Sequence, residues 1–197
     1  MTMLQKLPYP QSSTVLERFD LSEEYAKAAE KSGLDLSSMA PQEALSALVQ
    51  AELYLDTINF LAHGLPVRES IWWAAVCQRQ SAINWTVAET TLIELTQLWV
   101  KNPEESLRRD IDRRAEDIGF DSPAGWLGKA VFLSGTGSIG EDGGPVVTPQ
   151  PFLHSKMIFG AVALIPVIAS REDDDLEGNL YAAILEIALA VASGEWP

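Results

Sequence analysis

The segment SGTGSIGEDGGPVVTPQP, residues 134–151, contains the spacing G-x-G-x-x-G at Gly135, Gly137 and Gly140. This spacing binds a pyrophosphate through backbone N–H groups when it follows a buried strand and opens a helix. Here it follows a predicted helix, and the next residues, EDGGP, cannot begin one. The two carboxylates among them would repel a phosphate, and no lysine completes a P-loop. We therefore interpret the segment as a helix–helix connection rather than a nucleotide site.

Few other residues could carry catalysis. Nucleophilic catalysis needs a nucleophile beside an orienting base, and the chain has two histidines, His63 and His154, and one cysteine, Cys77. Cys77 lies within a predicted helix, which is typical of a buried structural thiol. A zinc site would need four clustered ligands, and the acidic run at 172–177 lacks the spacing of a calcium loop. We predict no catalytic residue, no metal site and no cofactor.

The composition narrows the class of protein. Of 197 residues, 47% are hydrophobic, which is enough for a packed core, and the formal net charge is -14. Such acidity disfavours nucleic acid and anionic membrane surfaces, which attract lysine and arginine. The longest apolar run, 157–169, contains Pro166 and is too short to span a membrane, so we expect no membrane insertion. With one cysteine and no signal-peptide pattern in the first 30 residues, we expect a cytoplasmic protein.

Helices must position the candidate residues, and prolines mark where most of these helices begin. Proline is favoured at the first helical position because its ring fixes a helical φ and its missing N–H has no partner there. Five predicted helices start in this way, at Pro41, Pro66, Pro103, Pro123 and Pro151. Three more lack the proline: residues 23–31, residues 87–101 after the capping box Thr86-x-x-Glu89, and residues 173–194.

This pattern predicts an all-α fold, a compact array of seven or eight helices with one long Gly/Pro-rich loop. The helix predicted from Pro41 runs as one element to Gly64. We assign residues 1–20 to an N-terminal arm or tail and residues 21–197 to a single helical domain. Because residues 157–169 and 180–192 are apolar nearly all round, we place both segments at the centre of the array.

Two adjacent tryptophans are the first candidates for partner binding. Trp72 and Trp73 point in directions that differ by about 100° on a helix, so one apolar stripe cannot bury both equally. We expect one of them to lie at an edge or a groove, where a tryptophan can anchor an interface. Burial of both in the core is the alternative interpretation.

The glycine-rich loop and a basic cluster are further candidates. Long loops often bind partners, and this one contributes the uncharged residues Ser134, Gly135, Thr136, Gly137 and Ser138. The cluster RRDIDRR contains Arg108 and Arg109. These arginines either pair with acids one turn away on a solvated face, as Arg108 would with Asp112, or contact an acidic surface of a partner. We favour the solvated face.

Five segments form a distinctive set. They are LPVRESIWWAAVC at 65–77, LWVKNPEESLRRDIDRRAE at 98–116, SPAGWLGKAVFLSGTGSI at 122–139, TPQPFLHSKMIFGAVAL at 148–164 and the ending ALAVASGEW. Together they resemble an uncharacterised bacterial family, a domain of unknown function whose genes often lie near type VI secretion components. The resemblance implies a compact protein of the bacterial cytoplasm and carries over no catalytic residue.

Two functional hypotheses remain open at this point. The first is a non-enzymatic protein-interaction module, an accessory or adaptor of a secretion system, which binds a protein partner and can also self-associate. The second is an enzyme or small-ligand-binding protein with an unfamiliar site of carboxylates and tryptophans. A deep polar pocket with perturbed carboxylates would favour the second, and a flat or grooved aromatic surface would favour the first.

The first prediction concerns the glycine-rich loop. Titration of the protein with NAD, ATP and GTP should give no heat of binding in a calorimeter, because the loop carries carboxylates and no helix follows it. Binding of any of the three at micromolar concentration would contradict this interpretation.

Overall fold

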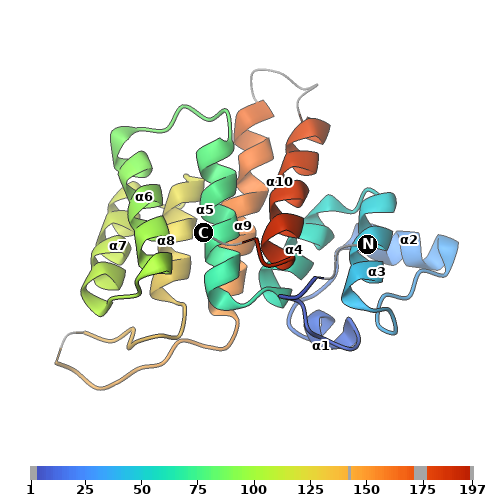
Figure 1. Cartoon of the computed structure of the whole chain (residues 1–197), viewed down its shortest axis with the longest axis horizontal. Helices are drawn as coiled ribbons and strands as arrows, with labels where there is room; N and C mark the ends of the chain where they lie inside the picture. Colours follow the sequence, from blue (N-terminus) through green and yellow to red (C-terminus); the bar gives the residue numbers. More distant parts are fainter. Residues whose placement is uncertain (1–3, 142, 171–176, 196–197) are drawn as a thin grey trace.

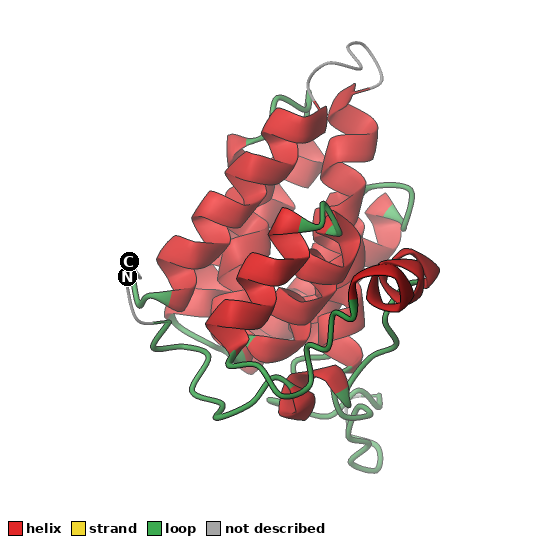
Figure 2. Ribbon diagram, turned by 90° about the vertical axis from the view of Figure 1, so that its right-hand side faces the viewer, coloured by secondary structure: helices red, strands yellow, loops and turns green. Residues whose placement is uncertain are grey.

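A computed structural model describes residues 4–141, 143–170 and 177–195, and all regular structure in these ranges is helical (Figures 1 and 2). The all-α prediction is confirmed, but the expected count of seven or eight helices is wrong. The described residues form ten helices: α1 Ser13–Leu16, α2 Glu23–Ser32, α3 Pro41–Gln50, α4 Tyr54–Gly64, α5 Val67–Gln80, α6 Val87–Lys101, α7 Glu105–Ile118, α8 Pro123–Phe132, α9 Leu153–Ala169 and α10 Glu177–Ala192.

The miscount has two local causes. The helix predicted from Pro41 to Gly64 is broken into α3 and α4, because Glu52 adopts a left-handed φ of 58° and the Leu53 N–H bonds back to the Leu48 carbonyl. The break redirects the chain, so that Leu48 and Ile58 are buried whereas Leu55 is 48% exposed. The short helix α1 accounts for the other addition, since it lies in the segment assigned to an arm.

The predicted helix caps are found at the helix starts, but only two of the five prolines are first helical residues. Pro41 and Pro123 are first helical residues, whereas Pro66, Pro103 and Pro151 lie just before the helices that follow them. Side-chain caps stabilise three starts: Ser22, Thr86 and Ser122 each accept a backbone N–H of the first turn. Thr86 and Glu89 form the predicted capping box.

Helix α9 lies at the centre of the array and packs against α4, α5, α8 and α10 (Figure 1). Its apolar side chains are fully buried at Ile158, Ala161 and Val162, which confirms the central position predicted for residues 157–169. Among the described residues, no helix combines the length and apolar character that crossing a membrane requires.

Helix α10 does not occupy the central position predicted for residues 180–192. One side of it is buried, through Ile184, Ala188 and Val191, but Leu189 is 46% exposed. The prediction was wrong for this helix because an apolar residue is not buried by its type alone; it must also face another element. Here α5, α9 and α4 cover only part of the circumference of α10.

The segment before α2 lies against the helices. Leu7 and Val15 are buried, and the Lys6 N–H donates to the Ala192 carbonyl at 2.8 Å. Lys6 also pairs with Glu69 of α5, with 2.8 Å between the charged atoms. The N-terminal segment thus contacts both α5 and the end of α10. The domain boundary assigned at residue 20 stays a prediction.

A second prediction tests the close approach of α7 and α8. A Cβ on Gly128 would lie 2.6 Å from the Cβ of Ala115, an atom fixed to the backbone of α7. Gly128→Ala should therefore lower the free energy of unfolding by about 1–3 kcal/mol, as measured by urea denaturation. Gly178→Ala is the matched control, since nothing lies within 4 Å of its added methyl and alanine favours a helix. Equal stability of the two variants would contradict the prediction.

Candidate interaction surface

The two adjacent tryptophans of α5 have different environments. Trp73 is fully buried, and its indole N–H donates to the Ile184 carbonyl of α10 at 3.0 Å, which ties the two helices together. Trp72 is partly buried and faces the exposed edge of α10. The Lys101 ammonium lies 5.4 Å from the centre of its ring, a cation–π contact. The pair therefore divides between core and groove, as the angle between helical neighbours predicts.

Trp72 lines a groove of about 380 Å³ between α5 and α10, which we call the Trp72 groove. Its apolar lining consists of Trp72, Val76, Ala183, Ile187, Ala190 and Val191. Gln80, Glu186 and Glu195 complete the lining, so both charged residues that line it are acidic. The groove thus combines one large aromatic anchor, small aliphatic side chains and negative charge.

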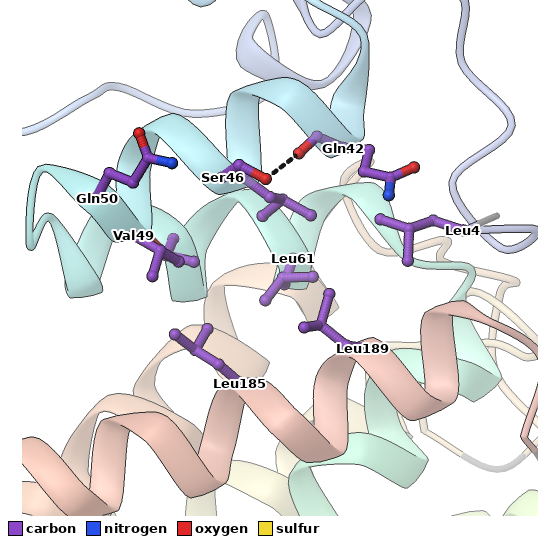
Figure 3. A pocket seen from close by; sticks show the side chains of 10 residues that line it. Leu4, Gln42, Ser46, Val49, Gln50, Leu61, Leu185 and Leu189 are labelled. Carbon is purple, nitrogen blue, oxygen red and sulfur yellow. Dashed lines mark hydrogen bonds between the residues drawn. The ribbon is translucent and has the colours of Figure 1, made fainter. Parts of the chain in front are cut away.

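A second hollow lies on the other side of α10, between α10, α3 and α4, and we call it the leucine pocket (Figure 3). It holds about 320 Å³. Its lining residues are all uncharged: Leu4, Leu45, Leu61, Leu185, Leu189, Val49, Thr57, Gln42, Ser46 and Gln50. The sequence does not predict this pocket, because the apolar run 180–192 indicates a helix that is covered on all sides. The signal that was available is Glu186, a charged residue within the apolar run, which indicates an exposed side.

The glycine-rich loop between α8 and α9 is held at its start by the predicted basic cluster. Arg108 is fully buried, and its guanidinium donates to the carbonyls of Phe132 and Ser138 and forms an ion pair with Glu105. The predicted solvated position of Arg108 and its pairing with Asp112 are therefore wrong; Asp112 pairs with Lys129 instead. A buried guanidinium needs several acceptors, and these come from both the loop and its own helix.

The loop residues near Arg108 include two glycines at positions where a side chain would disturb the structure. A Cβ on Gly137 would lie 2.6 Å from a Glu105 oxygen and 2.8 Å from an Arg108 nitrogen, so a larger residue there would push the ion pair away from the loop. Gly135 has a left-handed φ of 83°, which favours glycine. The Ser134 and Thr136 hydroxyls lie 3.0 Å apart within the turn.

The predicted partner-binding residues thus belong to two separate regions. Trp72 lies on α5 beside α10, whereas Arg109 and the loop lie with α7 and α8 at the other end of the array (Figure 1). Arg109 donates to the Gly140 carbonyl at 3.1 Å and pairs with Glu105 at 2.8 Å. The structure brings Arg108, Arg109 and Ser138 together, but it does not bring them to the tryptophans.

Both histidines are buried and lie near each other on α4 and α9. The His63 ring stacks on Phe19 at 5.0 Å between centroids, and its Nδ1 lies 3.0 Å from the Asn59 carbonyl oxygen. Burial, with a smaller contribution from His63, lowers the pKa of His154 to about 4. Burial also lowers the pKa of His63. Both rings are therefore neutral at pH 7.

The titratable groups of the described residues offer little for acid–base or metal chemistry. Burial raises the pKa of the Cys77 thiol well above its ordinary value, so the thiol stays protonated and unreactive. The side chain of Arg108 holds the pKa of Glu105 below its usual value. A catalytic acid needs the opposite shift. No group of three or more potential metal ligands occurs within the described ranges.

Comparison with known proteins identifies a family but no characterised relative. The family described as "Family of unknown function (DUF6931)" matches residues 44–192, most of the chain. No curated protein and no solved structure matches the chain.

A third prediction follows from the buried histidines. The unfolded chain binds a proton at His154 near pH 6.5, whereas the folded state does so only near pH 4, so stability is full above pH 6.5 and falls as the pH decreases towards 4. Between pH 7 and pH 5, this group should lower the free energy of unfolding by about 2 kcal/mol. Urea denaturation of the wild type and His154→Gln at both pH values isolates the effect. Identical pH dependence of the two proteins would contradict the buried neutral histidine.

Proposed function

Because the chain belongs to the DUF6931 family of unknown function, we propose its role from its own surfaces: it is a non-enzymatic protein-interaction module that binds a partner through the Trp72 groove. The observation that carries the proposal is the position of Trp72, partly buried beside the exposed apolar side of α10. Tryptophan is among the residues that contribute most to binding when a partner covers it, because it buries a large area at a small loss of side-chain entropy.

The lining of the groove supports a partner helix with apolar and basic residues. Val191 is buried and forms part of the base, while Ala183 and Ala190 are small enough to let a partner backbone approach. Glu186 and Glu195 would attract lysine or arginine on the flank of that helix. The net charge of -14 acts in the same direction over a longer range, because it favours association with a basic surface.

The same charges weigh against a second copy of this chain as the occupant. Helix α10 carries Glu186 beside the groove and no lysine or arginine, so two copies of α10 placed side by side would bring carboxylates together without a compensating cation on either helix. A hetero-complex with a basic partner avoids this repulsion. Self-association through the groove is therefore an alternative that the experiment below can detect.

We further propose that the partner belongs to a bacterial secretion apparatus and that the protein acts there as a cytoplasmic accessory or adaptor. This part of the proposal rests on the resemblance of its five characteristic segments to a family associated with type VI secretion genes. The exposed loop residues Gly135 and Thr136, with the partly buried Gly137, Ser138 and Arg109, form a second contact surface in the same proposal. Ser134 is only 7% exposed and is not part of this surface. The enzymatic alternative would need a carboxyl group with a raised pKa, and each carboxyl group of the described residues with a clearly shifted pKa, Asp35, Glu89, Glu105 and Glu116, is shifted down.

The fourth prediction tests the Trp72 groove directly. Trp72→Ala should weaken binding of the natural partner by tenfold or more, about 1.4 kcal/mol, as measured by calorimetry with the purified partner after its identification by affinity purification and mass spectrometry. Phe120→Ala is the matched control, since Phe120 is an aromatic residue that is 49% exposed at the turn between α7 and α8. It should leave the affinity unchanged.

Two further measurements keep the outcome interpretable. Circular dichroism and a thermal melt must show that both variants keep the wild-type fold. Affinity should also fall as salt is raised from low to physiological concentration, because Glu186 and Glu195 are screened. Unchanged affinity of folded Trp72→Ala would overturn the assignment of the groove, and a wild-type dimer that Trp72→Ala dissociates would replace the partner helix by a second copy.

A further inference from the structure

We propose that the leucine pocket binds one straight, uncharged aliphatic chain that ends in a hydroxyl or amide group. This is a second site, on the side of α10 opposite to the Trp72 groove, and it does not depend on the function proposed for that groove. Its volume of about 320 Å³ lies at the lower end of the range for small-molecule sites. It corresponds to about ten groups of the size of a water molecule.

The walls of the leucine pocket are mostly aliphatic, and part of the lining belongs to the packed core. Its base consists of side chains that are buried in the core, Leu45, Leu61 and Thr57. Leu185 and Leu189 of α10 point toward Leu61 from the facing side (Figure 3). No aromatic ring is among the lining residues, so the pocket offers flexible methyl groups rather than a flat surface. A narrow chain of methylene groups contacts such walls better than a planar ring does.

The polar side chains that can meet a ligand lie along α3, because the Thr57 hydroxyl at the base donates to the Leu53 carbonyl. Gln42, Ser46 and Gln50 occupy successive turns of α3, and the two glutamine side chains lie near opposite ends of the α3 wall (Figure 3). An amide side chain both donates and accepts hydrogen bonds. The Ser46 hydroxyl donates to the backbone carbonyl of Gln42 at 2.9 Å and can still accept one hydrogen bond. A ligand with a hydroxyl or amide end group would find partners at this edge.

Charge decides against a carboxylate ligand. None of the ten lining residues is charged, so no cation would compensate an anionic head group as it left water. The formal net charge of -14 adds a repulsion of longer range. A fatty acid in its ionised form is therefore disfavoured, whereas an alcohol or a primary amide with the same chain carries no such penalty.

The end of the leucine pocket favours a single chain over a protein helix. Leu4 lines the pocket, and its segment is fastened across the end of α10 by the hydrogen bond between the Lys6 N–H and the Ala192 carbonyl. A helix with side chains is about 10–12 Å wide and would collide with this segment on its way along α10. One aliphatic chain can end against Leu4 instead.

The fifth prediction uses decan-1-ol, decanamide and decanoate as probes of the full-length protein. In amide NMR spectra, decan-1-ol and decanamide should shift saturably the signals of lining residues such as Ser46 and Leu189, with a dissociation constant at least about tenfold lower than that of decanoate. Leu189→Glu should weaken decan-1-ol binding by about tenfold or more, because it places a charge on the exposed wall.

The controls separate this site from others. Leu98→Glu changes a residue of α6 that is 54% exposed, outside the pocket, and should leave decan-1-ol binding unchanged. Trp72→Ala should also leave it unchanged, so failure of the Trp72 groove would not be confused with failure here. The proposal is overturned by equal affinity for decanoate, by no saturable shift up to the solubility limit, or by shifts that persist in folded Leu189→Glu.

Discussion

The packing of α9 is the constraint on which the other elements depend. Because this helix is apolar nearly all round, it needs neighbours over most of its circumference, and α4, α5, α8 and α10 provide them, while Val167 near its C-terminal end is 52% exposed. Helix α10 is apolar to a similar degree, yet it packs at the edge of the array and keeps an uncovered side. The more central packing of α9 thus leaves α10 at the edge of the array, where it lines both the Trp72 groove and the leucine pocket.

At the opposite end of the array, a buried charge adds to the apolar packing of α7 against α8. Arg108 is fully buried. Its guanidinium joins α7 to the end of α8 through the Phe132 carbonyl and to the glycine-rich loop through the Ser138 carbonyl. The ring of Phe132 also lies 4.6 Å from the guanidinium carbon. Removing such an arginine would leave the Phe132 carbonyl without this donor, while Glu105 and the Ser138 carbonyl would keep only their hydrogen bonds from Arg109. The loop is therefore positioned by a contact that a surface arginine could not make.

The sequence was sufficient for the features that depend on local rules. Helix caps at Ser22 and Thr86, the all-α class, the central position of α9 and the different environments of Trp72 and Trp73 all follow from residue type and spacing within one or two turns. It was insufficient where distant residues decide. Residue 52 adopts a left-handed conformation although it is a glutamate, and not the glycine or asparagine that usually predicts such a conformation. The burial of Arg108 depends on carbonyl groups that lie 24 and 30 residues away in the chain.

The hydrogen bond between Lys6 and Ala192 has a consequence for how the chain reaches its fold. It joins residues that are separated by nearly the whole sequence, and Trp73 and Ile184 form a similar link across 111 residues. Contacts of such high sequence separation form late, because the loop that they close is long. During synthesis from the N-terminus, α4, α5 and α9 emerge before α10, so the apolar surface that α10 covers stays exposed until α10 leaves the ribosome.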